Sequence, residues 1–115
     1  MTIEVKCSAK ELREVASGKK KLITREIRPG NAKKYVLLNE KLECIGIRNF
    51  DRIYLHNDTL EASVTAEIEK IMLMEIVDEN GELVFYEQNG KKFQMVDWDC
   101  HIGKLLEISR NVPVV

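Results

Sequence analysis

The chain has 115 residues, the size of a single domain, with 44% hydrophobic and 32% charged residues, as in globular proteins. Its net charge of −1 combines a basic and an acidic segment: residues 19–34 hold seven basic residues and one acidic, and residues 58–87 hold nine acidic residues and one basic. No apolar run approaches the roughly 20 residues of a membrane span, and the first residues lack a signal-peptide core. We therefore expect one cytoplasmic domain, residues 1–115, without a membrane partner.

The first elements are a short strand and a helix. Thr2–Lys6 alternates in polarity and predicts the strand. Ser8 followed by Glu11 forms a capping-box pattern, which predicts a helix over Ser8–Ser17. Gly18 then stands where a helix-ending glycine is expected.

The next segment changes to a period of two, which predicts a strand from Leu22 to Arg28. The sequence Arg28-Pro29-Gly30-Asn31 predicts a tight turn because proline and glycine both interrupt a strand. Tyr35–Asn39 is a short apolar stretch that suits another strand. The connection Glu40–Asn49 shows no clear pattern.

The rest of the chain has the pattern of β structure. Turns are indicated at Asn57-Asp58, at Glu79-Asn80-Gly81 and at Asn89-Gly90, the last two being hairpin signals. The predicted strands are Arg52–His56, Ser63–Val77, Leu83–Glu87, Lys92–Val96 and Ile102–Ser109. Six or seven strands with one early helix predict a mainly β (α+β) fold, a small bent sheet or β-barrel with one N-terminal helix.

Cysteine and histidine patterns indicate no metal site and no cofactor. Cys7, Cys44 and Cys100 are too widely spaced for a zinc motif, so free thiols are expected. His56 and His101 are the only histidines, and neither lies near a nucleophile motif. Glycine-rich phosphate loops of the GxGxxG or GxxxxGK type are also missing from the sequence.

The basic segment Lys19–Lys34 is the main candidate for a function. Arginine and lysine bind phosphates, and arginine also pairs with carboxylates and base edges. A regular strand points Arg25 and Arg28 to opposite sides, so either Lys20, Thr24 and Arg28 share a face or a bulge changes the register. The alternatives are a solvated basic strand or a strand paired with the acidic segment.

The sequence VASGKKKLITREIRP, with Gly18, Lys20 and Arg25 or Arg28, resembles the GxKxxExR signature of the ASCH family of PUA-like β-barrels. The segments FDRIYLHNDTLEASVTAEIEKI and IGKLLEIS are similar to the middle and final strands of that family, so the resemblance extends from Leu12 to Ser109. Ile23 stands at the position of the motif glutamate.

The resemblance implies binding of RNA or a modified nucleoside, with anion contacts from Lys20, Arg25 and Arg28. Some ASCH proteins are amidohydrolases of acetylated cytidine, and this alternative makes Lys20 the activating base, Thr24 the nucleophile and Glu67 the acid. Whether the chain is an enzyme is left open. A third alternative is a protein-interaction module in which residues 58–87 meet a basic partner. Tyr35, Phe50, Tyr54 and Trp98 are the aromatic residues available for base stacking.

Overall fold

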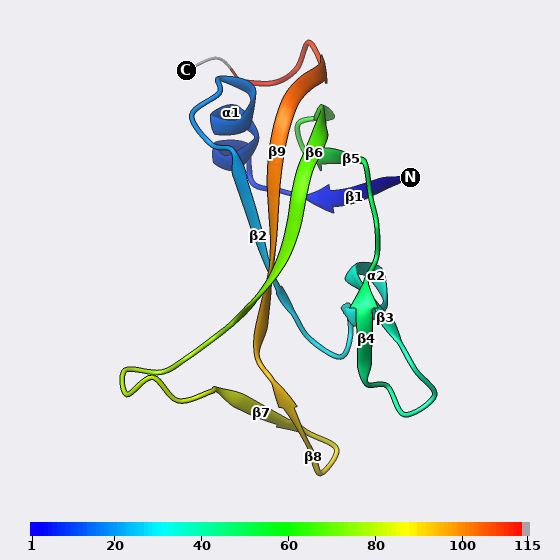
Figure 1. The fold of residues 1–115 in the computed structure, drawn as a ribbon. Coiled ribbons are helices and arrows are strands. Elements are labelled where there is room, and N and C mark those ends of the chain that lie inside the picture. Colours follow the sequence, from blue (N-terminus) through cyan, green and yellow to red (C-terminus); the bar gives the residue numbers. More distant parts are fainter. Residues whose placement is uncertain (114–115) are drawn as a thin grey trace. The chain divides into compact units, whose positions relative to one another are not determined.

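A computed structural model describes residues 1–113 (Figure 1). Strands hold 54% of the residues and helices 11%, which confirms the predicted mainly β class with few helices. No helix within residues 1–113 is both long enough and apolar enough to cross a membrane.

The elements follow the chain in this order: β1 Thr2–Lys6, α1 Ala9–Ala16, β2 Leu22–Ile27, α2 Ala32–Tyr35, β3 Val36–Leu38, β4 Cys44–Ile47, β5 Arg52–Asn57, β6 Ala62–Glu75, β7 Phe85–Gln88, β8 Lys91–Gln94 and β9 Val96–Ile108. One sheet has five strands in the order β1-β5-β6-β9-β2, and the pairs β3-β4 and β7-β8 form two small sheets. Strand β1 runs parallel to β5, whereas β5 and β6 are antiparallel.

The described chain divides into two compact units. Unit 1 comprises Met1–Ile23, Asn49–Lys70 and the described part of Cys100–Val115. Unit 2 comprises Thr24–Arg48 and Ile71–Asp99. Strands β6 and β9 each contribute residues to both units, so each unit contains a segment of the same long strands. The expectation of a single domain over 1–115 stays a prediction.

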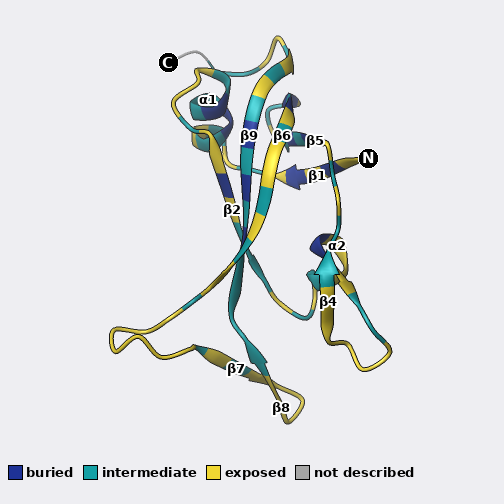
Figure 2. Ribbon diagram, viewed as in Figure 1, coloured by how far each residue is buried: buried dark blue, intermediate teal, exposed yellow. Residues whose placement is uncertain are grey.

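The hydrophobic core is concentrated in unit 1 (Figure 2). Alternate side chains of its strands are buried, and Leu12 and Val15 on the apolar face of α1 have no exposed surface. Of the fifteen buried hydrophobic residues in the described chain, twelve belong to unit 1. The three in unit 2 are Tyr35, Val36 and Trp98.

Helix α1 begins and ends as the sequence predicts. The Ser8 side chain accepts a hydrogen bond from the backbone N–H of Glu11 at 3.1 Å, which is the N-cap contact of the predicted capping box. Gly18 follows the helix with φ of +81°, a conformation that glycine adopts without the steric cost of a side chain.

Both predicted hairpin turns are confirmed. Asn89 and Gly90 have φ values of +54° and +76° between the paired residues Gln88 and Lys91. Two consecutive positive φ values at a two-residue loop are the signature of a type I′ turn. At the other turn, Gly81 donates its backbone N–H to the carbonyl of Asp78 at 3.0 Å, and Val77 and Leu83 form a bridge across it.

The strand count and several strand boundaries differ from the prediction. Strand β4 lies within Glu40–Asn49, where no pattern was clear, because Leu42 with φ of +63° turns the chain back onto β3. Strand β9 begins at Val96 rather than at Ile102, and Asp97-Trp98-Asp99-Cys100 already alternates between partly exposed and buried side chains. The described residues thus contain nine strands, and the four-residue helix α2 is an additional, unpredicted element.

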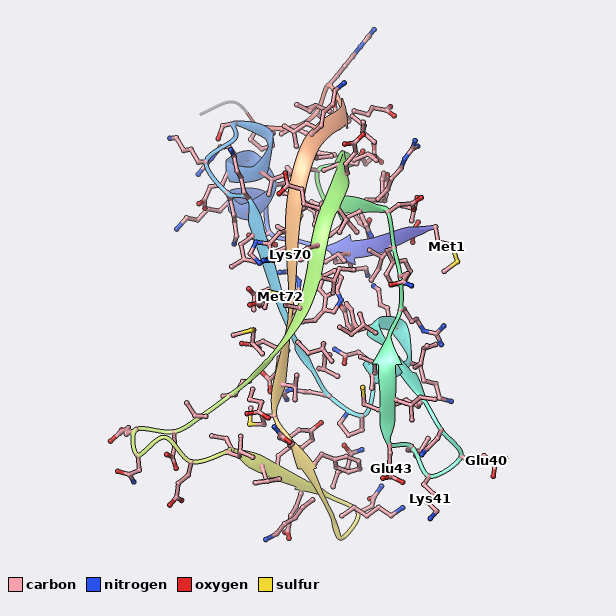
Figure 3. The ribbon with its side chains drawn as sticks, in the orientation of Figure 1. Met1, Glu40, Lys41, Glu43, Lys70 and Met72 are labelled. Carbon is pink, nitrogen blue, oxygen red and sulfur yellow. The ribbon has the colours of Figure 1, made fainter. Side chains whose placement is uncertain are left out.

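The loop between β3 and β4 is organised by one side chain. The Oδ1 atom of Asn39 accepts hydrogen bonds from the backbone N–H groups of Lys41 and Glu43, each at 2.9 Å. Glu40, Lys41 and Glu43 project from this loop (Figure 3). The backbone bonds fix the loop while its charged side chains remain exposed.

Candidate ligand-binding cavity

The basic segment passes from β2 into a turn at Arg28. The backbone N–H of Arg28 donates to Oδ1 of Asn31 at 2.8 Å, and Nδ2 of Asn31 donates to the carbonyl of Glu26 at 3.0 Å. The N–H of Asn31 also donates to the carbonyl of Arg28 at 3.0 Å, which confirms the predicted turn. Asn31 therefore holds the end of β2 and fixes where the Arg28 side chain begins.

Arg28 forms an ion pair with Glu26, with 3.2 Å between NH2 and Oε2. The Arg28 side chain is 64% exposed and that of Glu26 is 29% exposed. The hydrogen bond to Glu26 is the main cause that raises the pKa of Arg28 above its ordinary value. Arg28 thus remains accessible to an anionic ligand while its charge is partly neutralised by its neighbour.

The other predicted anion-binding residues have different surroundings. Lys20 lies in unit 1, where its ammonium is 2.9 Å from Oε2 of Glu11. Arg25 lies in unit 2 and donates from NH1 to the carbonyl of Thr24 at 2.8 Å. Burial raises the pKa of Tyr35, and the positive charge of Arg25 partly opposes that rise.

Each of the three residues predicted for catalysis has a different neighbour in the structure. Lys20 pairs with Glu11, and Thr24 in unit 2 donates from Oγ1 to Oδ1 of Asp99 at 3.0 Å. Glu67 is exposed on β6 in unit 1, opposite Arg52 in the sheet register. The catalytic roles of Lys20, Thr24 and Glu67 therefore stay a prediction.

Unit 2 contains a cavity of about 490 Å³. This volume falls within the 300–1,000 Å³ that is usual for small-molecule sites. Arg28 and Lys33 provide its positive charge, while Tyr86 and Gln94 provide a hydroxyl and an amide. The remaining lining residues are largely apolar: Ile27, Pro29, Ala32, Val36, Leu38, Leu42, Cys44, Leu73, Phe93 and Val96.

Two aromatic side chains face the cavity from the β7-β8 hairpin. The rings of Tyr86 and Phe93 are 5.8 Å apart between centroids, at an angle of 29°. They are direct partners in the antiparallel register. Partial burial raises the pKa of Tyr86, and Arg28 opposes that rise through its positive charge. The aromatic pair and the guanidinium therefore belong to one electrostatic environment.

The cavity includes residues that the sequence prediction did not select. Tyr86 and Phe93 were not among the aromatic residues proposed for stacking, whereas Tyr35 and Trp98 prove to be core residues with ring centroids 4.8 Å apart. The Asn89-Gly90 turn offered a signal for them. Residues three before and three after a two-residue turn face each other across a hairpin.

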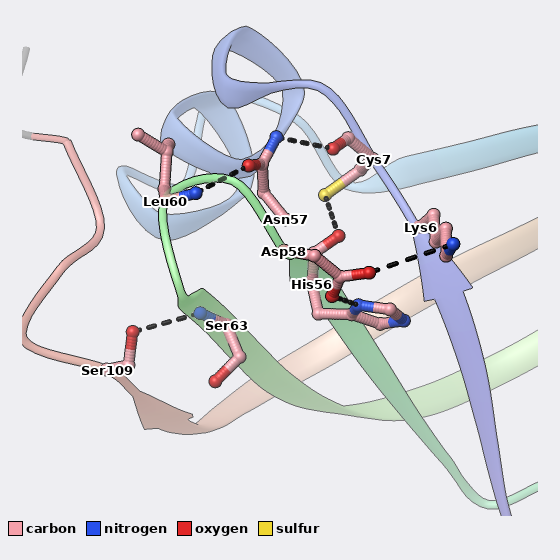
Figure 4. A network of polar contacts seen from close by, with 8 residues as sticks. All are labelled: Lys6, Cys7, His56, Asn57, Asp58, Leu60, Ser63 and Ser109. Atoms are coloured by element: carbon pink, nitrogen blue, oxygen red, sulfur yellow. Dashed lines mark hydrogen bonds and ion pairs between the residues drawn. The ribbon is translucent and has the colours of Figure 1, made fainter.

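The His56 side chain belongs to a structural network in unit 1 (Figure 4). Its Nδ1 atom is 2.8 Å from Oδ1 of Asp58, and this hydrogen bond is the main cause that lowers the pKa of Asp58. Lys6 approaches the other carboxylate oxygen at 3.7 Å, and the Cys7 thiol donates to the His56 carbonyl at 3.6 Å. These contacts connect the end of β1 to the β5-β6 turn.

All three cysteines are free, as the sequence predicts. Cys44 is exposed and lines the cavity, Cys7 is partly buried, and Cys100 is buried. Within residues 1–113, no group of three or more His, Cys, Asp or Glu side chains is arranged to hold a metal ion.

Comparison of the chain with family models, with curated proteins and with solved structures gave no match. The resemblance to the ASCH family therefore stays a prediction from the sequence. The cavity and its chemistry are the main basis for a functional proposal.

Proposed function

We propose that this protein binds RNA or a modified nucleoside in the cavity of unit 2, as a PUA-like domain of the ASCH type located in the cytoplasm. The observation that carries the proposal is the placement of two cations, Arg28 and Lys33, on a largely apolar cavity that also contains the Tyr86 and Phe93 rings. Proteins that bind single-stranded nucleic acids combine positive charge for the phosphates with aromatic faces for the bases.

Each part of the proposed ligand has a counterpart in the lining. A base stacks against the Tyr86–Phe93 pair, and the amide of Gln94 offers one donor and one acceptor to its edge. The phosphate or ribose side meets Arg28 and Lys33, which are both exposed. Arg25 supplies further positive charge within unit 2, and Lys20 supplies it within unit 1.

The test is the salt dependence of RNA affinity for wild type, Arg28→Gln and Lys33→Gln. Each lost phosphate contact should lower the slope of log affinity against log salt by about 0.7, the value for single strands. Lys41→Gln is the matched control because Lys41 is an exposed lysine of unit 2 outside the cavity lining. Equal slopes for all four proteins would remove the electrostatic part of the proposal.

A second measurement examines stacking. Phe93→Leu keeps an apolar side chain in the hairpin but removes the aromatic face. We expect it to weaken RNA binding by up to about 1–3 kcal/mol per stacked base without changing the salt slope. An unchanged affinity in Phe93→Leu, with a folded protein by circular dichroism, would place the base elsewhere.

A further inference from the structure

Unit 1 contains a second hollow, of about 330 Å³, that differs in chemistry from the unit 2 cavity. Its lining consists of Lys21, Glu69, His101, Ile102 and Gly103. Three of these five residues, Lys21, Glu69 and His101, have side chains that can carry a charge, so this hollow suits a polar ligand. Lys21 belongs to the basic segment Lys19–Lys34, whereas Glu69 and His101 were not selected as candidates from the sequence.

Gly103 lies directly against the Glu69 side chain. A Cβ atom at Gly103 would lie 3.0 Å from Cγ of Glu69 and 3.1 Å from its Oε1. Both distances are shorter than an ordinary van der Waals contact, so a larger residue at position 103 would require the Glu69 side chain to shift by a few tenths of an ångström. The Glu69 carboxylate therefore lies over the bare backbone of β9.

Lys21 and His101 line the hollow beside Glu69 and Gly103. The Lys21 carbonyl accepts a hydrogen bond from the backbone N–H of Ile102 at 2.9 Å, which keeps Lys21 beside β9. His101 lies between the buried residues Cys100 and Ile102. Because side chains alternate along a strand, the His101 side chain lies on the face of β9 opposite to the side chains of these two neighbours. Within residues 1–113, neither Lys21 nor Glu69 has an ion-pair partner within 4.0 Å.

We propose that this hollow binds the Watson–Crick edge of a guanine base. The two oxygens of Glu69 accept from the N1–H and N2–H groups of guanine, and the Lys21 ammonium donates to O6. Guanine alone among the four common bases offers two adjacent donors beside an acceptor on this edge. Adenine and cytosine each offer the carboxylate a single amino group, and uracil offers a single N–H. The His101 ring provides a flat face or a further hydrogen bond at the side of the base.

The experiment is a titration of the full chain with guanosine, inosine and adenosine 5′-monophosphates, followed by amide chemical shifts in NMR. Inosine lacks only the N2 amino group. We expect guanosine monophosphate to shift the amides of residues 101–103 and to bind about tenfold more tightly than inosine monophosphate, because a bidentate contact contributes about 1–3 kcal/mol of discrimination. Adenosine monophosphate should bind more weakly still.

Two variants test the role of the carboxylate. Glu69→Gln replaces one acceptor oxygen by a donor and should lower the affinity for guanosine monophosphate about tenfold. Gly103→Ala places a Cβ atom 3.0 Å from Cγ of Glu69, so Glu69 must shift by a few tenths of an ångström, and we expect a smaller loss of affinity than in Glu69→Gln. Glu107→Gln is the control, since Glu107 is an exposed glutamate of the same strand outside the hollow.

Equal affinities for the three nucleotides, or an affinity that Glu69→Gln does not change, would overturn this assignment. So would shifts confined to residues of unit 2. The inference does not depend on the unit 2 cavity, because its readout is the amides of residues 101–103 and its variants lie in unit 1. Loss of RNA binding through Arg28 or Lys33 would leave the expected guanine result unchanged.

Discussion

The guanidinium of Arg28 lies edge-on to the carboxylate of Glu26, with 3.2 Å from Nε to Oε1 and 3.2 Å from NH2 to Oε2. Both residues belong to unit 2, and Arg28 lines the proposed ligand cavity. An incoming phosphate must therefore compete with Glu26 for the same guanidinium. The free protein keeps this cation oriented but partly neutralised.

Glu26→Gln should strengthen the binding of RNA. The substitution removes the competing negative charge and leaves a side chain of nearly the same size. We expect the affinity to rise about two- to fivefold at low salt, the range that exposed charge pairs contribute, and the gain to shrink as salt increases. The measurement is fluorescence anisotropy with a labelled single-stranded RNA. Glu40→Gln on the β3-β4 loop is the control, and an equal gain in that variant would indicate a general effect of net charge.

Asn31→Ala should destabilise the protein. It removes the bonds from the Arg28 N–H to Oδ1 and from Nδ2 to the Glu26 carbonyl. We expect a loss of about 1–2 kcal/mol in the free energy of unfolding, measured by urea denaturation. Asn80→Ala at the exposed turn is the comparison. If both variants lost the same amount, the two bonds at Asn31 would have no special contribution.

Asp97→Asn should stabilise the protein at neutral pH. Partial burial, followed by the negative charges of Asp99 and Glu26, raises the pKa of Asp97 above its ordinary 3.8. The folded state thus disfavours the ionised form, so the native residue lowers stability once the pH rises above that range. Urea unfolding from pH 3 to pH 7 should show a gain for Asp97→Asn that grows with pH. A gain that is constant over this range would contradict the electrostatic cause.

Alkylation should distinguish the cysteines. Cys44 is exposed, whereas burial raises the pKa of the Cys100 thiol to about 12. Because the thiolate is the reactive form, iodoacetamide at pH 8 should modify Cys44 first and Cys100 only after unfolding, as followed by mass spectrometry. A nucleoside bound in the unit 2 cavity should slow the reaction at Cys44. Modification of Cys44 at the same rate with saturating ligand would argue against that binding position.

Local patterns in the sequence predicted much of the fold. The Ser8 cap, the Gly18 stop and the Asn89-Gly90 turn depend on interactions within a few residues, and each is confirmed. The boundaries of β9 were harder to predict because Asp97 and Asp99 reduce the average hydrophobicity of a strand that is buried on one face only. Strand β4 depends on pairing with β3, which local propensity does not reveal.

The sites were less predictable than the fold. The basic segment Lys19–Lys34 includes Arg28, which lines a cavity. Phe93 and Gln94 line the same cavity, and they belong to a hairpin that is far from Arg28 in the sequence. Cavities form where segments far apart in sequence meet, so a single charged run identifies one side of a site at most. The hollow at Gly103 illustrates the same limit, because its glycine matters only through Glu69 of another strand.

The buried position of Trp98 has an optical consequence. Trp98 is the sole tryptophan of the chain, it has no exposed surface, and its ring lies 4.8 Å from that of Tyr35 within unit 2. Its fluorescence therefore comes from one known position and needs no attached dye. Emission at short wavelength reports an intact Trp98 environment, and a shift to longer wavelength reports that water has reached the indole. The protein thus contains its own probe for local opening of unit 2, and hydrogen exchange in unit 1 can be compared with it under the same conditions.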